Sequence, residues 1–181
     1  MRADAARNLD AVLQTGARLL AEDPSTSMGV IAVQAGVDRR TVYRRFECRE
    51  ALLDAVFCAK LTALDKVYAD ARLDSAPVAV ALHRFVEGVI EVVRRYPLDT
   101  ERMRGDAGAY GRVLQHGEQL EAFMRRAADE GLIRSDLPDG MAVALLKQTI
   151  ALLARKFGEI ERGRAADIAV DILLGGIGQN V

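Results

Sequence analysis

The sequence predicts an all-α fold of about nine helices, with a small N-terminal helical unit followed by a larger helical domain. Apolar residues recur at spacings of three and four along nearly all of the 181 residues, which is the pattern of amphipathic helices. No segment has the alternation of apolar and polar residues that is typical of a strand meander. Residues that start or stop helices separate the apolar segments, which supports a chain built from consecutive helices.

Three helices are predicted in the N-terminal unit, and each has a recognisable boundary. Pro24 ends the first helix, and Thr26 or Ser27 caps the second. Gly36 breaks the second helix, and Asp38 is the expected N-cap of the third. The predicted helices are residues 3–21, 28–35 and 39–46. We place this domain at residues 1–48.

The second domain is predicted to span residues 49–181, and its first helix connects the two domains. Pro77 lies near the first turn of the helix after that one. The glycine-punctuated segment 104–112 is expected to be a weak helix or a mobile connection, and the tail from Gly175 to Gly178 is expected to fray. The predicted helices are residues 49–71, 77–96, 113–130, 139–157 and 164–174.

Composition excludes several classes of protein. No stretch long enough to cross a bilayer is free of charge, so we expect no membrane span. The N-terminus lacks the apolar run of a signal peptide, which predicts a cytoplasmic location. Cys48 and Cys58 have no histidine between them and do not match metal-ligand spacing, so we expect two free thiols, no metal and no cofactor.

Catalytic signatures are also missing from the sequence. There is no nucleophile elbow and no cluster of His, Cys and carboxylate ligands. The glycines at 105, 108 and 111 do not form a phosphate-binding loop after a strand. The two histidines, His83 and His116, are too far apart in sequence to indicate an acid–base pair. We therefore predict that the protein is not an enzyme.

The segment from Thr26 to Leu53 carries the functional signal. Met28, Ile31 and Val37 supply an apolar face between two short helices, and Gly36 permits the tight turn that joins them. The net charge of the chain is −1. Residues 25–49, however, contain five arginines against two acidic residues. A basic patch on a nearly neutral protein favours contact with phosphates through one face.

The second short helix places a basic and polar face outside. Val42 and Phe46 lie four residues apart and are expected to face inward. The residues left on the outer surface are Arg39, Arg40, Thr41, Tyr43 and Arg44. Arginine can bind guanine through O6 and N7, threonine can contact a thymine methyl, and tyrosine can donate to a phosphate. This face therefore favours binding to duplex DNA.

The segment resembles the DNA-binding domain of the tetracycline-repressor (TetR) family of bacterial regulators. The matching motifs, in order, are Ile31-Ala32, Ala35-Gly36-Val37, Thr41-Val42-Tyr43, Arg45-Phe46, Arg49-Glu50 and Leu52-Leu53. The resemblance implies that Arg39, Arg40, Thr41 and Arg44 face the major groove and that Tyr43 binds a phosphate. It also implies contacts from Thr26 and from Arg49 to the DNA backbone.

Two positions depart from the family pattern. Glu47 stands where a basic or small residue is usual, and it would repel a phosphate. Cys48 and Ala51 replace the usual capping box, so the start of the long helix is expected to be softer. These departures support one alternative, a helical sensor or interaction protein with a decayed DNA-binding face, whereas the intact run of arginines argues against it.

For the C-terminal half, the resemblance implies a cavity for a small-molecule effector and a homodimer built from the last two helices. Such a dimer would bind a near-palindromic DNA operator, and ligand would most commonly relieve repression. The candidate pocket residues are Phe85, Tyr96, Met103, Tyr110, His116, Phe123 and Met124. The candidate dimer residues are Leu145, Ile150, Leu152, Leu153, Ile168, Ile172 and Leu173. The alternative for the dimer residues is an ordinary core within one chain, and the alternative for the pocket residues is plain core or plain surface.

Overall fold

The computed structural model describes residues 2–99 and 107–178, and in these ranges it contains eight helices and no strand. The helices are α1 (Arg2–Glu22), α2 (Met28–Gln34), α3 (Arg39–Arg45), α4 (Arg49–Ala71), α5 (Val78–Arg95), α6 (Ala107–Asp129), α7 (Met141–Lys156) and α8 (Arg162–Ile177). The all-α prediction is confirmed. In the described part of the chain, no helix is both long enough and apolar enough to cross a membrane.

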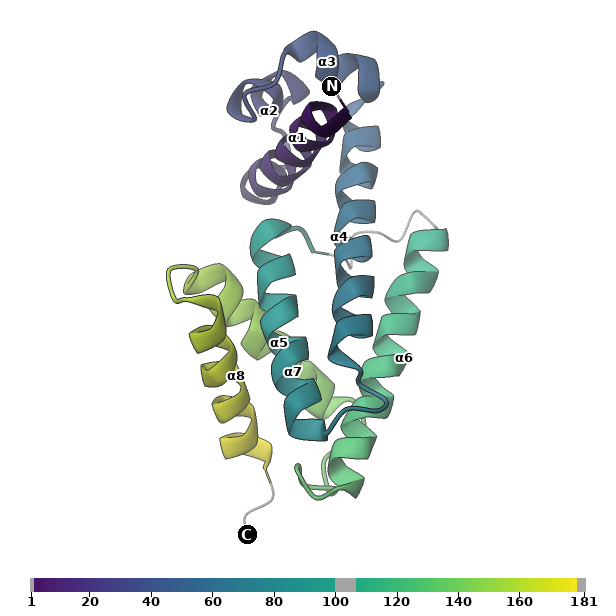
Figure 1. Cartoon of the computed structure of the whole chain (residues 1–181), viewed down its shortest axis with the longest axis vertical. Coiled ribbons are helices and arrows are strands. Elements are labelled where there is room, and N and C mark those ends of the chain that lie inside the picture. The colour runs from purple at the N-terminus through teal and green to yellow at the C-terminus, as the bar shows by residue number, and fades with distance from the viewer. Residues whose placement is uncertain (1, 100–106, 179–181) are drawn as a thin grey trace.

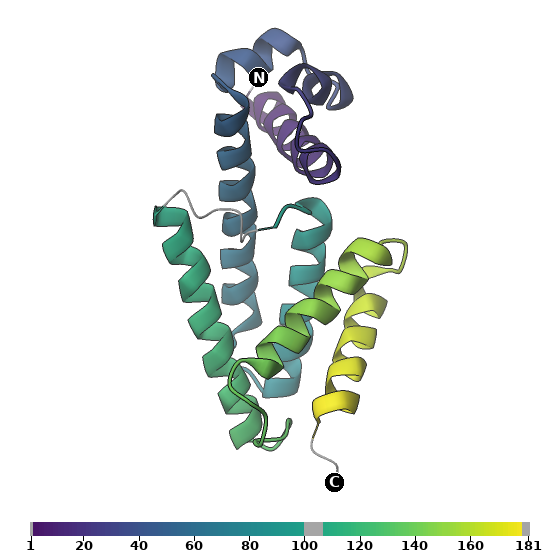
Figure 2. The same cartoon turned by 180° about the vertical axis from the view of Figure 1, so that it is seen from behind.

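The helices form an elongated molecule with a small group of helices at one end and a larger group at the other. Figure 1 shows α1, α2 and α3 gathered at one end, with α4 running from them down into the larger group of helices. Helix α5 packs against α4, α7 and α8, while α6 packs against α4 on its other side. The opposite view in Figure 2 shows α7 crossing in front of α5. Helix α4 is thus the element shared by both ends of the molecule.

Two separate hydrophobic cores lie along α4. The first joins α1, α2 and α3 to the N-terminal part of α4, through residues such as Ile31, Leu52 and Leu61. It also includes Tyr96 and Leu98, which follow α5. The second core lies among α5, α6, α7 and α8. Helix α4 as far as Leu61 thus packs in the first core, in keeping with its predicted place between the two domains, whose boundary at residue 48 stays a prediction.

Close packing between α4 and α5 depends on one glycine. A Cβ atom placed on Gly88 would lie 2.8 Å from Cγ1 of Val67. Real Cβ atoms do not approach other carbon atoms this closely, so any larger residue would push the helices apart or displace the valine. Gly88 therefore sets how near the two helices lie.

Two glycine-rich segments differ from the sequence-based expectation. Helix α6 begins at Ala107 and continues through Gly111. The part of segment 104–112 that the structure describes therefore belongs to α6, so residues 2–99 and 107–178 form eight helices where the sequence predicted about nine. The expected fraying from Gly175 is also wrong, because α8 continues to Ile177. Ile177 is buried, and its carbonyl accepts a hydrogen bond from the Arg134 amide at 2.9 Å, so tertiary packing holds the last turn.

Candidate nucleic-acid interface and effector groove

The turn between α2 and α3 has the geometry that the sequence predicted. The Ser27 hydroxyl accepts a hydrogen bond from the Val30 amide at 3.3 Å and caps α2. Gly36 adopts φ 67°, a left-handed conformation that favours glycine. A carboxylate oxygen of Asp38 accepts from the Arg40 amide at 2.8 Å and caps α3. These caps fix the start of α3 and the direction in which it projects.

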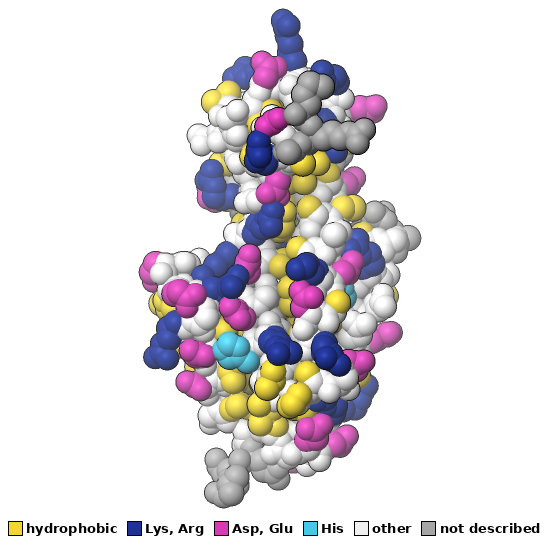
Figure 3. Space-filling view, in the orientation of Figure 1, with side chains coloured by type: hydrophobic (Ala, Val, Ile, Leu, Met, Phe, Trp, Pro, Cys, Tyr) yellow, Lys and Arg dark blue, Asp and Glu magenta, His cyan; other side chains and the backbone are white. Residues whose placement is uncertain are grey.

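Helix α3 presents its basic face to solvent at the end of the molecule. Val42 and Phe46 are buried in the first core, as predicted. The exposed side chains are those of Arg39, Arg40, Tyr43, Arg44 and Arg45, and Thr41 is half-buried. No hydrogen bond or ion pair within the described residues occupies the guanidinium groups of Arg39, Arg40 or Arg44. Figure 3 shows basic side chains projecting from this end of the molecule. The face thus carries cations whose donors are free for an external acceptor.

Arg49 occupies a different environment from the arginines of α3. Its guanidinium donates to the carbonyl of Pro24 and lies 3.5 Å from a carboxylate oxygen of Glu50. This contact fastens the turn between α1 and α2, which contains the half-buried Thr26, to the start of α4. The structure therefore gives Arg49 a bracing contact that the sequence did not indicate.

The first turn of α4 is capped by a thiol. The Sγ atom of Cys48 accepts a hydrogen bond from the Ala51 amide at 3.5 Å and caps α4. Sulfur is a weak acceptor, so this cap is present but weaker than that of a hydroxyl. The expected loss of the capping box is therefore partly compensated. Glu47, just before it, is exposed.

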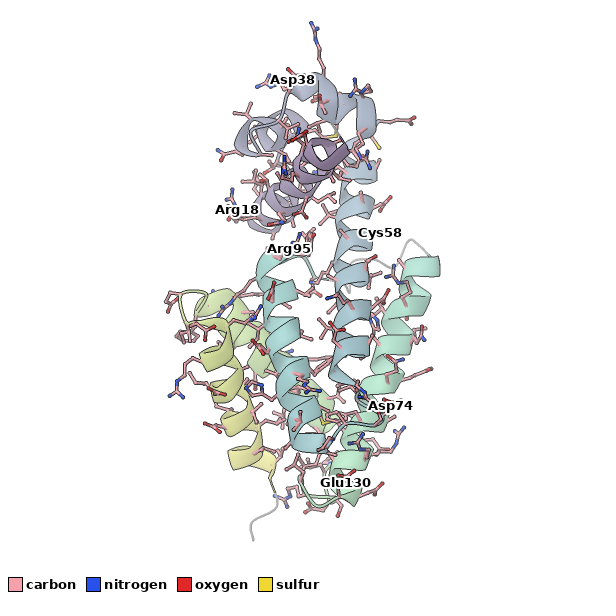
Figure 4. All side chains as sticks on the ribbon, viewed as in Figure 1. Arg18, Asp38, Cys58, Asp74, Arg95 and Glu130 are labelled. Carbon is pink, nitrogen blue, oxygen red and sulfur yellow. The ribbon has the colours of Figure 1, made fainter. Side chains whose placement is uncertain are left out.

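Polar side chains from α1, α4 and the end of α5 meet between the two cores. We call this region the neck, and it consists of Asp10, Lys60, Arg95 and Tyr96. Arg95, at the end of α5, is 2.5 Å from a carboxylate oxygen of Asp10 in α1, and the Tyr96 hydroxyl lies 3.4 Å from the same oxygen. Figure 4 labels Arg95 where α5 approaches α1. The ammonium of Lys60 is buried close by and donates to the Leu98 carbonyl. Sequence reasoning missed this neck, because the spacing of charges along one helix does not reveal partners on another.

A groove of about 840 Å³ lies between α4 and α6. Of the predicted pocket residues, His116 and Phe123 line it. Phe85 and Met124 are buried in the second core, and Tyr110 is exposed. Tyr96 lies in the neck rather than beside the groove, and Met103 lies outside the described residues. The volume is in the range of sites for small molecules.

A polar network links α4 and α6 along the groove. Asp65 of α4 accepts from Arg112, and its other oxygen lies 2.8 Å from Nε2 of His116. The ring of Tyr68 stacks on His116 with centroids 4.3 Å apart, and its hydroxyl donates to the His116 carbonyl at 3.0 Å. Burial lowers the pKa of His116, whereas its hydrogen bond to Asp65 acts in the opposite direction. Ion pairs and stacking thus tie α4 to α6 beside the groove.

The predicted dimer residues divide into two groups. Ile150, Leu153 and Leu173 are buried within the chain, and Ile168 is half-buried against the second core. Leu145, Leu152 and Ile172 are exposed, by 41%, 50% and 52% respectively. These three side chains lie on α7 and α8, the helices that the sequence predicts to form the dimer. The exposed group remains the predicted interface.

Known proteins resemble this chain both in its N-terminal segment and in its overall fold. The family model described as "Bacterial regulatory proteins, tetR family" matches residues 12–56. The TetR-like regulator LfrR from Mycobacterium smegmatis, solved with proflavine, is 23% identical and aligns over 97% of this chain and 98% of its own, with a TM-score of 0.72. The ketosteroid regulator KstR2 of Mycobacterium tuberculosis is 20% identical over 93% and 94% of the two chains, with a TM-score of 0.76. No curated protein sequence gives a match.

Proposed function

We propose that this chain, which carries a TetR-family DNA-binding domain over residues 12–56 and has the fold of that family's transcriptional regulators, is a ligand-responsive regulator that reads duplex DNA with α3. The observation that carries the proposal is the face of α3. Its arginines have no partners among the described residues, while Val42 and Phe46 anchor the helix in the first core. A rigid helix with free donors is suited to a groove lined by phosphates and base edges.

Each side chain on this face has a distinct role in the proposal. Arg39, Arg40, Thr41 and Arg44 face the base edges of the major groove, where arginine can form a bidentate pair with guanine. Tyr43, which is 53% exposed, donates its hydroxyl to a phosphate. We expect no catalytic activity from a protein of this kind.

A homodimer would place two copies of α3 on one DNA site. The exposed apolar residues of α7 and α8 support an interface on that side of the molecule. A two-fold dimer presents two recognition helices related by symmetry, so its operator would be near-palindromic with half-sites about one helical turn apart or a multiple of it.

Helix α4 links the groove to the DNA-binding helices. Its Asp65 and Tyr68 border the groove, and its first turn touches the α1–α2 turn through Arg49. A ligand that changes the packing of α6 on α4 would tilt α4, and because the first core is built on α4, the recognition helix would move with it. DNA affinity would then fall, which corresponds to repression relieved by ligand.

The test is fluorescence anisotropy over a salt series, with duplex DNA from the region flanking the protein's own gene. We expect saturable binding that weakens steeply with salt, because bound arginines displace counterions. Replacing Tyr43→Ala together with Arg44→Ala is expected to weaken binding by on the order of 100-fold.

Arg18→Ala is the matched control, since Arg18 is an exposed arginine at the far end of α1 from Asp38 and α3 (Figure 4). Equal affinity of the wild type for flanking and unrelated DNA, or equal loss in the Arg18→Ala control, would count against the proposal.

A further inference from the structure

Arg72 ends α4 in an unusual backbone conformation. Its φ is 53°, and it is the only residue other than glycine with a positive φ in the described part of the chain. Helices commonly end on such a left-handed residue, but glycine or asparagine usually occupies it because a larger side chain is strained there. Backbone strain that a folded protein retains is common at functional sites, so we expect the Arg72 side chain to have a function. Arg72 lines the groove between α4 and α6, which indicates a function in binding a ligand there.

The other cations of the groove already have partners. Arg112 donates to Asp65, and Arg126 donates to the Leu73 carbonyl at 2.6 Å and to the carbonyl of Ala76. The Nε atom of Arg126 also lies 2.9 Å from a carboxylate oxygen of Glu130. The backbone carbonyl of Arg72 accepts hydrogen bonds from the amides of Ser75 and Ala76, at 3.1 and 2.9 Å, but no hydrogen bond or ion pair engages its guanidinium within residues 2–99 and 107–178. Its guanidinium is therefore the cation in the groove that remains available to a ligand.

The acidic residues of the groove are less available to a ligand cation. Both carboxylate oxygens of Asp65 are occupied, one by Arg112 and the other by His116. Asp74 accepts from the Ser75 hydroxyl at 3.0 Å and forms no ion pair with Arg72. A cationic ligand would have to displace Arg112 from Asp65, whereas an anionic ligand at Arg72 displaces no protein contact.

Apolar side chains line the groove beside the charged ones. Ala69 and Leu73 contribute from α4 and the residues that follow it, and Ala122 and Phe123 contribute from α6. Figure 4 labels Asp74 and Glu130 where α4 and α6 end close together, the end of the groove at which Arg72 lies. One end of the groove thus offers a free cation, and its walls offer apolar surface.

We propose that this groove binds an amphipathic anion, whose carboxylate or phosphate group pairs with Arg72 and whose apolar part lies along α4 and α6. The inference rests on the proposed function only in taking the groove as the effector site. Arginine suits this task because its planar guanidinium forms two parallel hydrogen bonds with such an anion. Strain at the end of α4 is then the cost of placing arginine where glycine would be relaxed.

Isothermal titration calorimetry with four ligands that share a decyl chain tests the inference. The probes are decanoate, decyl phosphate, 1-decanol and decyltrimethylammonium, each below its micellar concentration and added to the full chain. We expect one or both anions to bind and the alcohol and the cation to bind at least tenfold more weakly. The tighter of the two anions identifies the head group.

Three variants locate the anion. Arg72→Gln is expected to weaken the anion at least tenfold, and Arg72→Gly is expected to do the same while raising the thermal midpoint, because glycine relaxes the positive φ. Arg125→Gln, at an exposed α6 arginine outside the groove lining, should leave affinity unchanged.

Failure of both anions to bind, equal binding of the alcohol or cation, or full anion affinity in Arg72→Gln would overturn the inference. DNA binding by the unliganded protein is measured separately. If DNA binding is intact and anion discrimination is absent, only this inference fails, whereas absence of specific DNA binding refutes the proposed function.

Discussion

Lys60 lies in the neck between the two cores, where its charged side chain is almost fully buried. Replacing it with methionine measures how much this buried charge lowers the free energy of unfolding. Its exposed fraction is 4%, and its ammonium donates to the Leu98 carbonyl. Burial lowers the pKa of Lys60 from 10.5 to about 8. Arg155 contributes in the same direction, and Asp99 opposes it. The folded state therefore disfavours the charged lysine.

A decrease of this size in pKa corresponds to about 3 kcal/mol against the protonated lysine in the folded state. Lys60→Met removes that penalty but also removes the hydrogen bond to Leu98, which contributes about 1 kcal/mol. We therefore expect the variant to be more stable than the wild type by about 2 kcal/mol at pH 7.

The pH dependence has a definite sign. Below pH 8 the lysine is protonated in both the folded and the unfolded state, so the full penalty applies. Between pH 8 and 10.5 the folded state loses its proton first, and the stability of the wild type relative to Lys60→Met rises with pH. The advantage of the variant should thus shrink across this window.

Urea unfolding at fixed protein concentration, at pH 7 and at steps up to pH 10, measures both effects. Lys66→Met is the matched control, because Lys66 is an exposed lysine on the same helix and its ion pair with Asp70 at 3.4 Å contributes little. A Lys60→Met variant that is less stable than the wild type at pH 7, with a difference that does not change with pH, would refute this reasoning.

Two further predictions concern packing. Leu152→Glu combined with Ile172→Glu should convert the proposed dimer to monomers in light scattering, because charged side chains would replace apolar ones at the interface. Leu114→Glu, at an exposed leucine of α6, is the control and should leave the dimer intact. A dimer that survives the double change would rule out this face as the interface. Gly88→Ala should lower the free energy of unfolding by about 1–3 kcal/mol, and Val67→Ala should restore most of it. Unchanged stability of Gly88→Ala would show that α4 and α5 tolerate a wider separation.

Local signals were enough to predict most helix boundaries. Asp38 and Gly36 fix the turn before α3 by hydrogen bonding and backbone conformation within a few residues, which sequence spacing reveals. The glycines in α6 and α8 led to the wrong prediction of weak or frayed helix. Each glycine destabilises a helix by only about 1 kcal/mol, and burial of neighbouring apolar side chains can outweigh that cost. Ile177 supplies such burial at the end of α8, and the segment that covers it lies more than forty positions earlier, at Ile133 and Arg134.

Contacts between distant segments explain what sequence could not predict at the site. The outward face of α3 follows from the helical repeat alone, because Val42 and Phe46 define the inner side. The neck and the groove depend on side chains that meet across helices, such as Asp10 with Arg95. An apolar pattern also cannot say whether Leu153 is covered by its own chain or by a second copy.

Selection of binding sites from a pool of randomised duplex DNA tests most directly whether α3 reads sequence. The wild type is compared with the Tyr43→Ala, Arg44→Ala double variant under identical salt. The account predicts that the wild type enriches a near-palindromic motif, with half-sites about one helical turn apart or a multiple of it, and that the double variant enriches none. Absence of any enriched motif for a folded wild-type protein, or the same motif from both proteins, would contradict it.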